Sequence, residues 1–111
     1  MLTTPKQAGD LSSLARLLFA VPTDRRRAVA IEVCEKAMMA REWRDATLNR
    51  HPRWGCGDVM TVARNFELDG KRVSLPPEPD YDNDDYCACT IIALEAFRVL
   101  NSIPAKQERA A

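Results

Sequence analysis

The sequence predicts a mostly α-helical fold, a compact bundle of about four helices. Three long stretches repeat apolar residues at the spacing of an α-helix, and prolines or glycines separate them. A shorter helical stretch follows the glycine-containing segment 51–58. A chain of 111 residues, 46% of them hydrophobic, is long enough to bury a core. We therefore expect a single helical domain over residues 1–103, with residues 104–111 as a flexible tail.

The first helix is expected to end at Val21-Pro22, because proline disfavours a helical conformation in the residue before it. Its start has two alternatives. Thr4-Pro5-Lys6-Gln7 has the pattern of a capping box, whereas Asp10 is a second candidate for the N-cap. The residues that should face the core recur at i, i+3, i+4 and i+7: Leu11, Leu14, Ala15 and Leu18.

The second helix is expected to run from a Thr23 cap to about Leu48, with apolar residues over a wide arc. Such coverage suits a helix with more than one neighbour, and it would also allow a homodimer that uses part of this face. A short third helix should follow an Asp58 cap. Asp69-Gly70 between alternating flanks then indicates one short β-hairpin between the third and fourth helices.

The fourth helix follows a proline-rich segment, residues 76–79, which predicts an extended linker. Asp84 or Asp85 is expected to cap the helix, which should run to about Asn101. Its polar residues lie on one narrow arc and the remaining positions are apolar. We therefore expect the fourth helix to be the central, buried helix of the bundle.

Charge and hydropathy exclude several classes of protein. Sixteen basic and sixteen acidic residues give a formal net charge of zero, unlike the strongly basic composition of a dedicated nucleic-acid-binding domain. No apolar run approaches the roughly 20 residues that cross a bilayer, and no signal-peptide pattern is present. The sequence therefore predicts a cytoplasmic protein that has no membrane partner and keeps its four cysteines reduced.

Motifs for metal binding and catalysis are weak. A zinc site would need ligands from a scattered set: His51, Cys56, Cys87 and Cys89. No Cys-x2–4-Cys pair is present among them, and residues two apart on a helix point in nearly opposite directions. The acidic run that begins at Asp80 lacks the glycine and glutamate of a calcium loop. We expect no metal, no cofactor and no enzymatic activity, with a thiol or zinc protein as the least favoured alternative.

The segment 41–54 concentrates rare residues at a helix joint, including the only histidine and both tryptophans. Arginine and tryptophan are enriched at protein-binding hot spots, and they also suit phosphate contact and base stacking. The candidate partner-binding residues are Arg41, Trp43, Arg44, Arg50, His51, Arg53 and Trp54. We expect a small interaction or regulatory protein that binds a protein partner here. The alternative is a nucleic-acid-binding regulator, or a phage-type DNA-handling protein, that uses the same surface.

A purely structural interpretation of these residues is also open. Basic residues outnumber acidic ones between positions 25 and 53, and acidic residues concentrate between 67 and 85. The acidic segment could neutralise the basic helix, while the arginine stems cover apolar surface and the two tryptophans fill the gap between helices. His51 could serve the turn or bond the last carbonyls of the preceding helix.

Several runs together resemble a family of small uncharacterised alphaproteobacterial proteins. They are His51-Pro52-Arg53-Trp54-Gly55, Asp58-Val59-Met60, Pro77-Glu78-Pro79-Asp80 and Asp85-Tyr86-Cys87-Ala88-Cys89. The resemblance covers about residues 11–100. The chain departs from the pattern at Cys56, where a polar residue is expected, and around Asp69-Gly70, where it is longer. The resemblance implies a cytosolic bacterial or phage-derived context and no defined activity.

Overall fold

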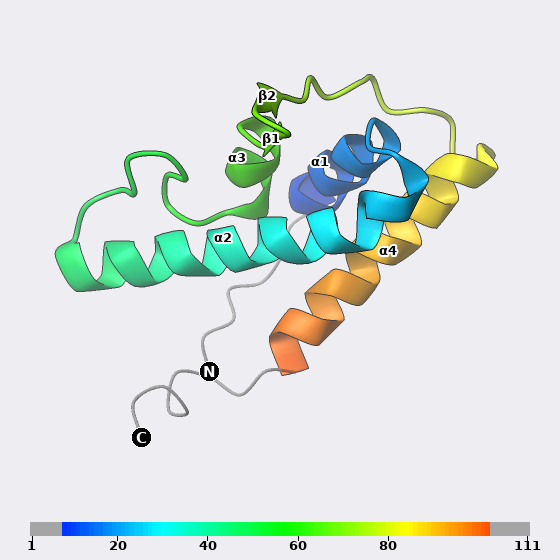
Figure 1. Cartoon of the computed structure of the whole chain (residues 1–111). Helices are drawn as coiled ribbons and strands as arrows, with labels where there is room; N and C mark the ends of the chain where they lie inside the picture. The colour runs from blue at the N-terminus through cyan, green and yellow to red at the C-terminus, as the bar shows by residue number, and fades with distance from the viewer. Residues whose placement is uncertain (1–7, 103–111) are drawn as a thin grey trace.

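A computed structural model of the chain describes residues 8–102. Within this range the elements are α1 Ala8–Phe19, α2 Arg26–Thr47, α3 Val59–Arg64, β1 Glu67–Leu68, β2 Lys71–Arg72 and α4 Asp84–Ser102. A 3-10 turn, Thr23–Arg25, leads into α2. The predicted fold class is confirmed: the structure is a helical bundle with one antiparallel two-stranded hairpin between α3 and α4 (Figure 1). The capping-box alternative at residues 4–7 and the expected tail lie outside the described residues.

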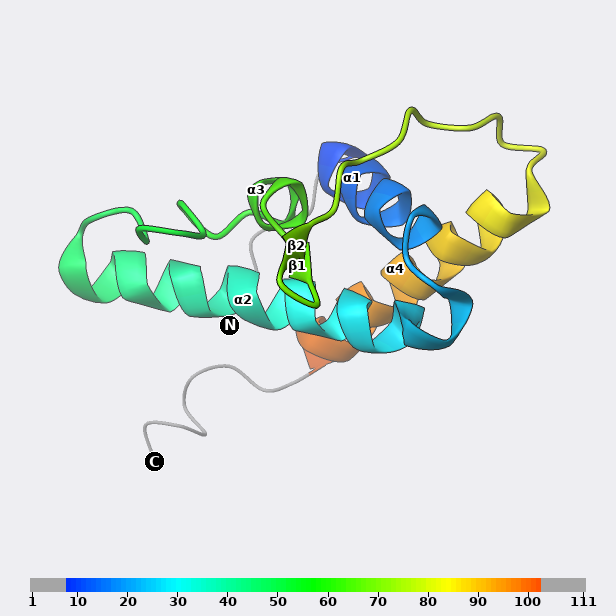
Figure 2. The ribbon, with the colours of Figure 1, turned by 45° about the horizontal axis from the view of Figure 1, so that its top comes forward.

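One helix, α2, reaches beyond the other helices at one end of the molecule. α4 packs against α1 and α2, and α3 packs against the same two helices (Figure 1). The C-terminal part of α2 extends beyond the other helices, and the loop of residues 48–58 folds back along it (Figure 2). The linker of residues 73–83 then passes across the molecule to the start of α4. The projecting end of α2 and its loop therefore form a separate feature at the edge of the bundle.

The core is built where the helices meet. Its largest fully buried side chains are Tyr86, Phe66, Leu14, Leu17, Leu18, Val21, Val33, Val59 and Val62. Burial of one such side chain contributes roughly 1.5–3 kcal/mol. The apolar face of α2 is part of this core, with Val29, Ala30, Val33 and Cys34 all buried within the chain. This part of the face is used by the fold itself, and the homodimer that the sequence allowed stays a prediction.

The expectation that α4 is the central, buried helix of the bundle is wrong for one side of the helix. Ile91, Leu94 and Val99 are each about half exposed, at 55%, 45% and 49%. α1 and α2 cover two sides of α4, and no other element of the described chain covers the third side. An apolar composition did not distinguish a surrounded helix from one with an exposed apolar side.

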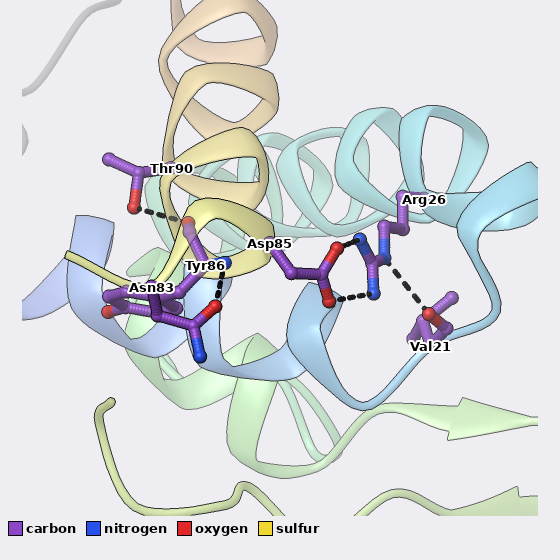
Figure 3. Close-up of polar contacts among 6 residues, drawn as sticks. All are labelled: Val21, Arg26, Asn83, Asp85, Tyr86 and Thr90. Carbon is purple, nitrogen blue, oxygen red and sulfur yellow. Dashed lines mark hydrogen bonds and ion pairs between the residues drawn. The ribbon is translucent and has the colours of Figure 1, made fainter. Parts of the chain in front are cut away.

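The helix starts also differ from the sequence predictions. Asp10 does not cap α1 but lies in its first turn, and its carboxylate accepts a hydrogen bond from the backbone N–H of Met60 at 3.0 Å. α4 is capped by Asn83, whose Oδ1 accepts the backbone N–H of Tyr86 at 2.9 Å (Figure 3). The predicted cap Asp85 does not serve this purpose, because Asn83 already accepts the free N–H at the start of the helix. The Asp85 carboxylate points toward α2 instead.

Asp85 and Arg26 form the main polar link between α4 and α2 (Figure 3). The guanidinium is buried; its two terminal nitrogens donate to the two oxygens of Asp85 at 2.7 and 3.1 Å, and its Nε donates to the carbonyl of Val21 at 3.0 Å. This hydrogen-bonded pair raises the pKa of Arg26 and lowers the pKa of Asp85. The start of α2 is thereby tied both to the end of α1 and to the start of α4.

Candidate functional site

The loop of residues 48–58 touches the backbone of α2 at a glycine. Gly57 has φ +91°, and a Cβ there would lie 2.6 Å from the carbonyl oxygen of Ala37 and 2.8 Å from the backbone nitrogen of Arg41. Only glycine combines this conformation with so close an approach. The guanidinium of Arg41 donates a hydrogen bond of 3.2 Å to the Gly57 carbonyl, which secures the same contact. Arg41 is half-buried, and its guanidinium helps to hold the loop against α2.

His51 organises the turn at the tip of this loop. Its backbone pairs with that of Gly55 through two hydrogen bonds of 2.9 and 3.0 Å. Its ring Nδ1 accepts the backbone N–H groups of Arg53 and Trp54, both at 3.1 Å. Since Nδ1 is the acceptor, the ring proton of the neutral histidine lies on Nε2. His51 therefore acts as a turn residue, in the way that asparagine or aspartate does in an Asx turn.

Trp54 lies inside the structure rather than on its surface. It is only 3% exposed. Two cations lie over its ring, with the Arg53 guanidinium carbon 4.5 Å and the Lys36 Nζ 5.4 Å from the ring centroid. These distances permit cation–π attraction. As a large apolar side chain on a tight turn, the indole gains most by folding onto α2, and a partner cannot reach it without opening the loop.

Trp43 is the tryptophan that the fold exposes. It is 44% exposed, and its ring meets that of His51 edge-on with the centroids 5.3 Å apart. Met39 lies four residues earlier on the same face of α2 and is 45% exposed. Leu48 ends the helix and is 88% exposed. We call these three apolar residues, together with the exposed cations Arg44, Arg50 and Arg53, the α2-end surface.

Leu48 also has an unusual backbone conformation. Its φ is +63°, in the left-handed region where helices commonly place glycine, and its N–H donates to the carbonyl of Arg44 at 2.7 Å. Neither Met39 nor Leu48 is among the residues predicted from the sequence. No local sequence signal marks either one, because exposure and backbone conformation depend on how far α2 projects past its neighbours.

Acidic side chains neutralise part of the basic stretch. Asp69 pairs with Arg25 at 2.8 Å, which lowers the pKa of Asp69 through the hydrogen bond. Glu67 lies 3.4 Å from Arg53, and Asp45 lies 3.6 Å from Arg44. The neutralisation considered from the sequence therefore exists in space at Arg25, at Arg53 and at the Arg26–Asp85 pair. In residues 8–102, Arg50 makes no ion pair.

The cysteines do not gather into a site. None of the four cysteines, all of which lie in the described chain, forms a disulfide; Cys34 and Cys89 are buried, and Cys56 and Cys87 are half-buried. Burial raises the pKa of the Cys89 thiol. In the part of the chain that the structure describes, no group of three histidine, cysteine, aspartate or glutamate residues is placed to hold a metal ion. The zinc alternative thus has no ligand set among these residues.

Residues 5–97 match a family described as a domain of unknown function, DUF7742. The chain belongs to this family. No curated protein and no solved structure matches it. The match agrees with the resemblance to an uncharacterised family, whereas the bacterial origin and the individual motifs stay predictions.

The DUF7742 region contains the complete loop, the projecting end of α2 and the hairpin, as well as α4 up to Phe97. The α2-end surface is therefore part of the family's own domain. No helix in the described part of this DUF7742 protein is both long enough and apolar enough to span a membrane.

Proposed function

We propose that this DUF7742 protein is a small non-enzymatic interaction or regulatory protein that binds a protein partner through the α2-end surface. The observation that carries the proposal is Leu48, which combines a left-handed backbone with 88% exposure. A left-handed conformation costs an ordinary residue roughly 1–2 kcal/mol. A leucine that gains almost no burial in return does little for its own fold, and such residues cluster at binding sites.

The neighbours of Leu48 support a protein-binding role. Trp43 and Met39 add two large apolar side chains to the same end of α2. Exposed tryptophan and arginine side chains are the residue types that dominate the binding energy of protein interfaces. The buried Trp54 and the close contact at Gly57 hold the loop against α2. A surface that is ordered before binding loses less entropy when a partner docks.

A protein partner fits this surface better than a nucleic acid does. Arg44 and Arg53 already face carboxylates at 3.6 and 3.4 Å. A phosphate backbone would have to displace those carboxylates or accept their repulsion, whereas a protein partner can use apolar contacts and leave the pairs at the rim. The three large apolar side chains have no counterpart in a purely phosphate-reading surface.

The test uses the tagged full chain as bait in cell extract, followed by binding measurements with the purified captured protein. Leu48→Gly is the decisive variant, because glycine relieves the left-handed strain while it removes the side chain. We expect Leu48→Gly to raise the free energy of unfolding by roughly 1 kcal/mol and to weaken partner binding at least tenfold. Trp43→Ser should weaken binding similarly. Ile91→Ser, which removes a comparably exposed apolar side chain from α4, should leave binding unchanged.

Two results would contradict the proposal. One is a purified partner that binds wild type, Leu48→Gly and Trp43→Ser equally well, which would make the α2 end a structural feature. The other is capture of nucleic acid alone, with affinity that falls steeply as salt rises and depends on Arg50 rather than on Leu48. That second result would establish the nucleic-acid alternative instead.

A further inference from the structure

Three arginines surround a hollow that lies apart from the α2-end surface. The hollow has a volume of about 430 Å³ and is lined by Arg16, Arg64, Arg72, Val73, Ser74 and Leu75. The arginines come from three elements: α1, the last residue of α3, and β2. No carboxylate is among these lining residues of the described chain. A chain with zero net charge thus places three arginines together at one hollow.

Two of these guanidinium groups are held in position by the backbone. The Nε of Arg16 donates to the carbonyl of Pro76 at 2.6 Å, and the Nε of Arg72 donates to the carbonyl of Arg64 at 3.0 Å. Guanidinium is planar, so a bond through Nε fixes the plane in which the terminal nitrogens lie. Both arginines are therefore oriented before any ligand arrives, which lowers the entropy lost on binding.

Arg26 shows, within the same molecule, how an arginine anchored through Nε binds a carboxylate. Its Nε also donates to a backbone carbonyl, that of Val21, and its two terminal nitrogens grip both oxygens of Asp85. Arg16 and Arg72 have the same anchor through Nε, yet neither they nor Arg64 forms an ion pair within residues 8–102. The position that Asp85 fills at Arg26 is left for an anion from outside.

Two carboxylates close to these arginines do not fill that position. The carboxylate of Glu78 accepts hydrogen bonds from Tyr86 and Ser12, which lower its pKa, and the charge of Arg16 lowers it further, but no ion pair joins Glu78 to Arg16 within residues 8–102. Glu67 is the cross-strand partner of Arg72 in the hairpin, and paired side chains of opposite charge often join across a sheet. Here the Glu67 carboxylate pairs with Arg53 at 3.4 Å instead. Arg64 has an exposed side chain, and its guanidinium makes no hydrogen bond to the described chain.

We propose that the hollow lined by Arg16, Arg64 and Arg72 binds a phosphate-bearing small molecule. Arginine forks match the oxygens of phosphate in paired hydrogen bonds, and several together favour a multiply charged group. The volume lies in the usual range for small-molecule sites. Val73 and Leu75 supply an apolar wall for the body of the ligand, and the Ser74 hydroxyl is a further polar group. This site is independent of the α2-end surface and of its proposed protein partner.

The experiment is a calorimetric titration of the full chain with inorganic pyrophosphate and with a nucleoside 5′-diphosphate, at constant ionic strength. We expect saturable binding to wild type by both and an affinity at least tenfold lower in Arg64→Gln. Arg64 is the decisive position because its side chain is exposed and makes no hydrogen bond or ion pair within residues 8–102, so the fold should be retained. Lys71→Gln is the matched control: it removes one cation from β2, next to Arg72, and Lys71 does not line the hollow. Its affinity should stay within about twofold of wild type.

The two ligands separate the possible sources of the phosphate group. Tighter binding of the nucleoside diphosphate indicates a phosphate ester with an organic body, and equal binding indicates the phosphate group alone; both support the site. Three results would overturn it: no binding above that of sulfate at the same ionic strength, equal weakening in Arg64→Gln and Lys71→Gln, or tighter binding of a short single-stranded DNA that Arg64→Gln leaves unchanged.

Discussion

The carboxylate of Asp10, in the first turn of α1, accepts a hydrogen bond of 3.0 Å from the backbone N–H of Met60, in the first turn of α3. The first N–H groups of any helix have no partner within it. Asp58, which precedes α3, makes no side-chain cap bond and accepts the hydroxyl of Thr61 instead. α1 therefore supplies the cap that the short helix α3 lacks, and α3 in turn leads into the hairpin.

Replacement of Asp10 should destabilise the junction between α1 and α3. We expect Asp10→Ala to lower the free energy of unfolding by about 1–2 kcal/mol, because it removes a cap and leaves a part-buried N–H unpaired. Asp10→Asn keeps an acceptor oxygen and should cost less. Urea unfolding measures both, with Asp24→Ala, an exposed acid before α2, as the control. Equal stability of the Asp10→Ala and Asp24→Ala variants would show that the contact contributes nothing.

Alanine substitutions at Gly57 and Gly70 together test the contact between the loop and α2. Both have positive φ, but a Cβ at Gly57 would meet the backbone of α2, whereas a Cβ at Gly70 would meet nothing within 4 Å. Gly70→Ala should cost only the backbone strain, about 1 kcal/mol. Gly57→Ala adds a clash with Ala37 and Arg41, so it should cost at least about 2 kcal/mol and release the loop from α2. Thermal unfolding and Trp54 fluorescence would report both effects, and equal losses would contradict the contact.

His51 has a turn role that asparagine can imitate. Asn at this position offers an oxygen to the backbone N–H groups of Arg53 and Trp54, as in an Asx turn, whereas Ala offers nothing. We expect His51→Ala to cost about 1 kcal/mol and to speed hydrogen exchange of those two amides. His51→Asn should retain most of the protection while it loses the ring contact with Trp43. Equally fast exchange of the two amides in wild type and in His51→Ala would exclude the turn role.

Acid should weaken the link between Asp85 and Arg26. The hydrogen bonds from Arg26 lower the pKa of Asp85 in the folded protein. The pair therefore contributes its full stability above the unfolded pKa of about 4 and loses it as pH falls through the lower folded pKa. Asp85→Asn should be clearly less stable than wild type at pH 7, with a difference that shrinks toward pH 2. Asp84→Asn, which makes no bond to Arg26, is the control in the same unfolding series.

High pH should destabilise the fold by ionising Tyr86. Burial, with the hydrogen bond to Glu78, raises the pKa of Tyr86 to about 12 from its usual 10. The neutral phenol is favoured in the fold, so its stabilisation is complete below pH 10 and is lost between pH 10 and pH 12. Tyr86→Phe lacks this titration and should lose less stability than wild type over that interval. The same loss in both proteins, measured by urea unfolding at each pH, would contradict the assignment.

Much of the fold could be read from local patterns. The apolar spacing at Leu11, Leu14 and Leu18 located α1, and the Asp69-Gly70 turn located the hairpin. The stop at Val21-Pro22 was also close to the observed end of α1. The predicted Thr23 cap of α2 was wrong, because Thr23 begins the 3-10 turn and α2 starts at Arg26 with no side-chain cap bond. These features depend on contacts between residues a few positions apart, which a single sequence displays directly. The partners of Asp10 and Asp85 are fifty and fifty-nine positions away, so no local pattern could reveal them.

The candidate site was predicted only as a region. The sequence by itself determined that cations and indoles gather at the joint after α2, and that a tight glycine turn follows. Only the tertiary structure decided that Trp54 is buried, that Trp43 and Leu48 are exposed, and that Arg16, Arg64 and Arg72 meet at one hollow. The reason is physical: a residue's type sets which contacts favour it, whereas its exposure and its neighbours depend on segments that are distant in the chain and meet only when the helices pack.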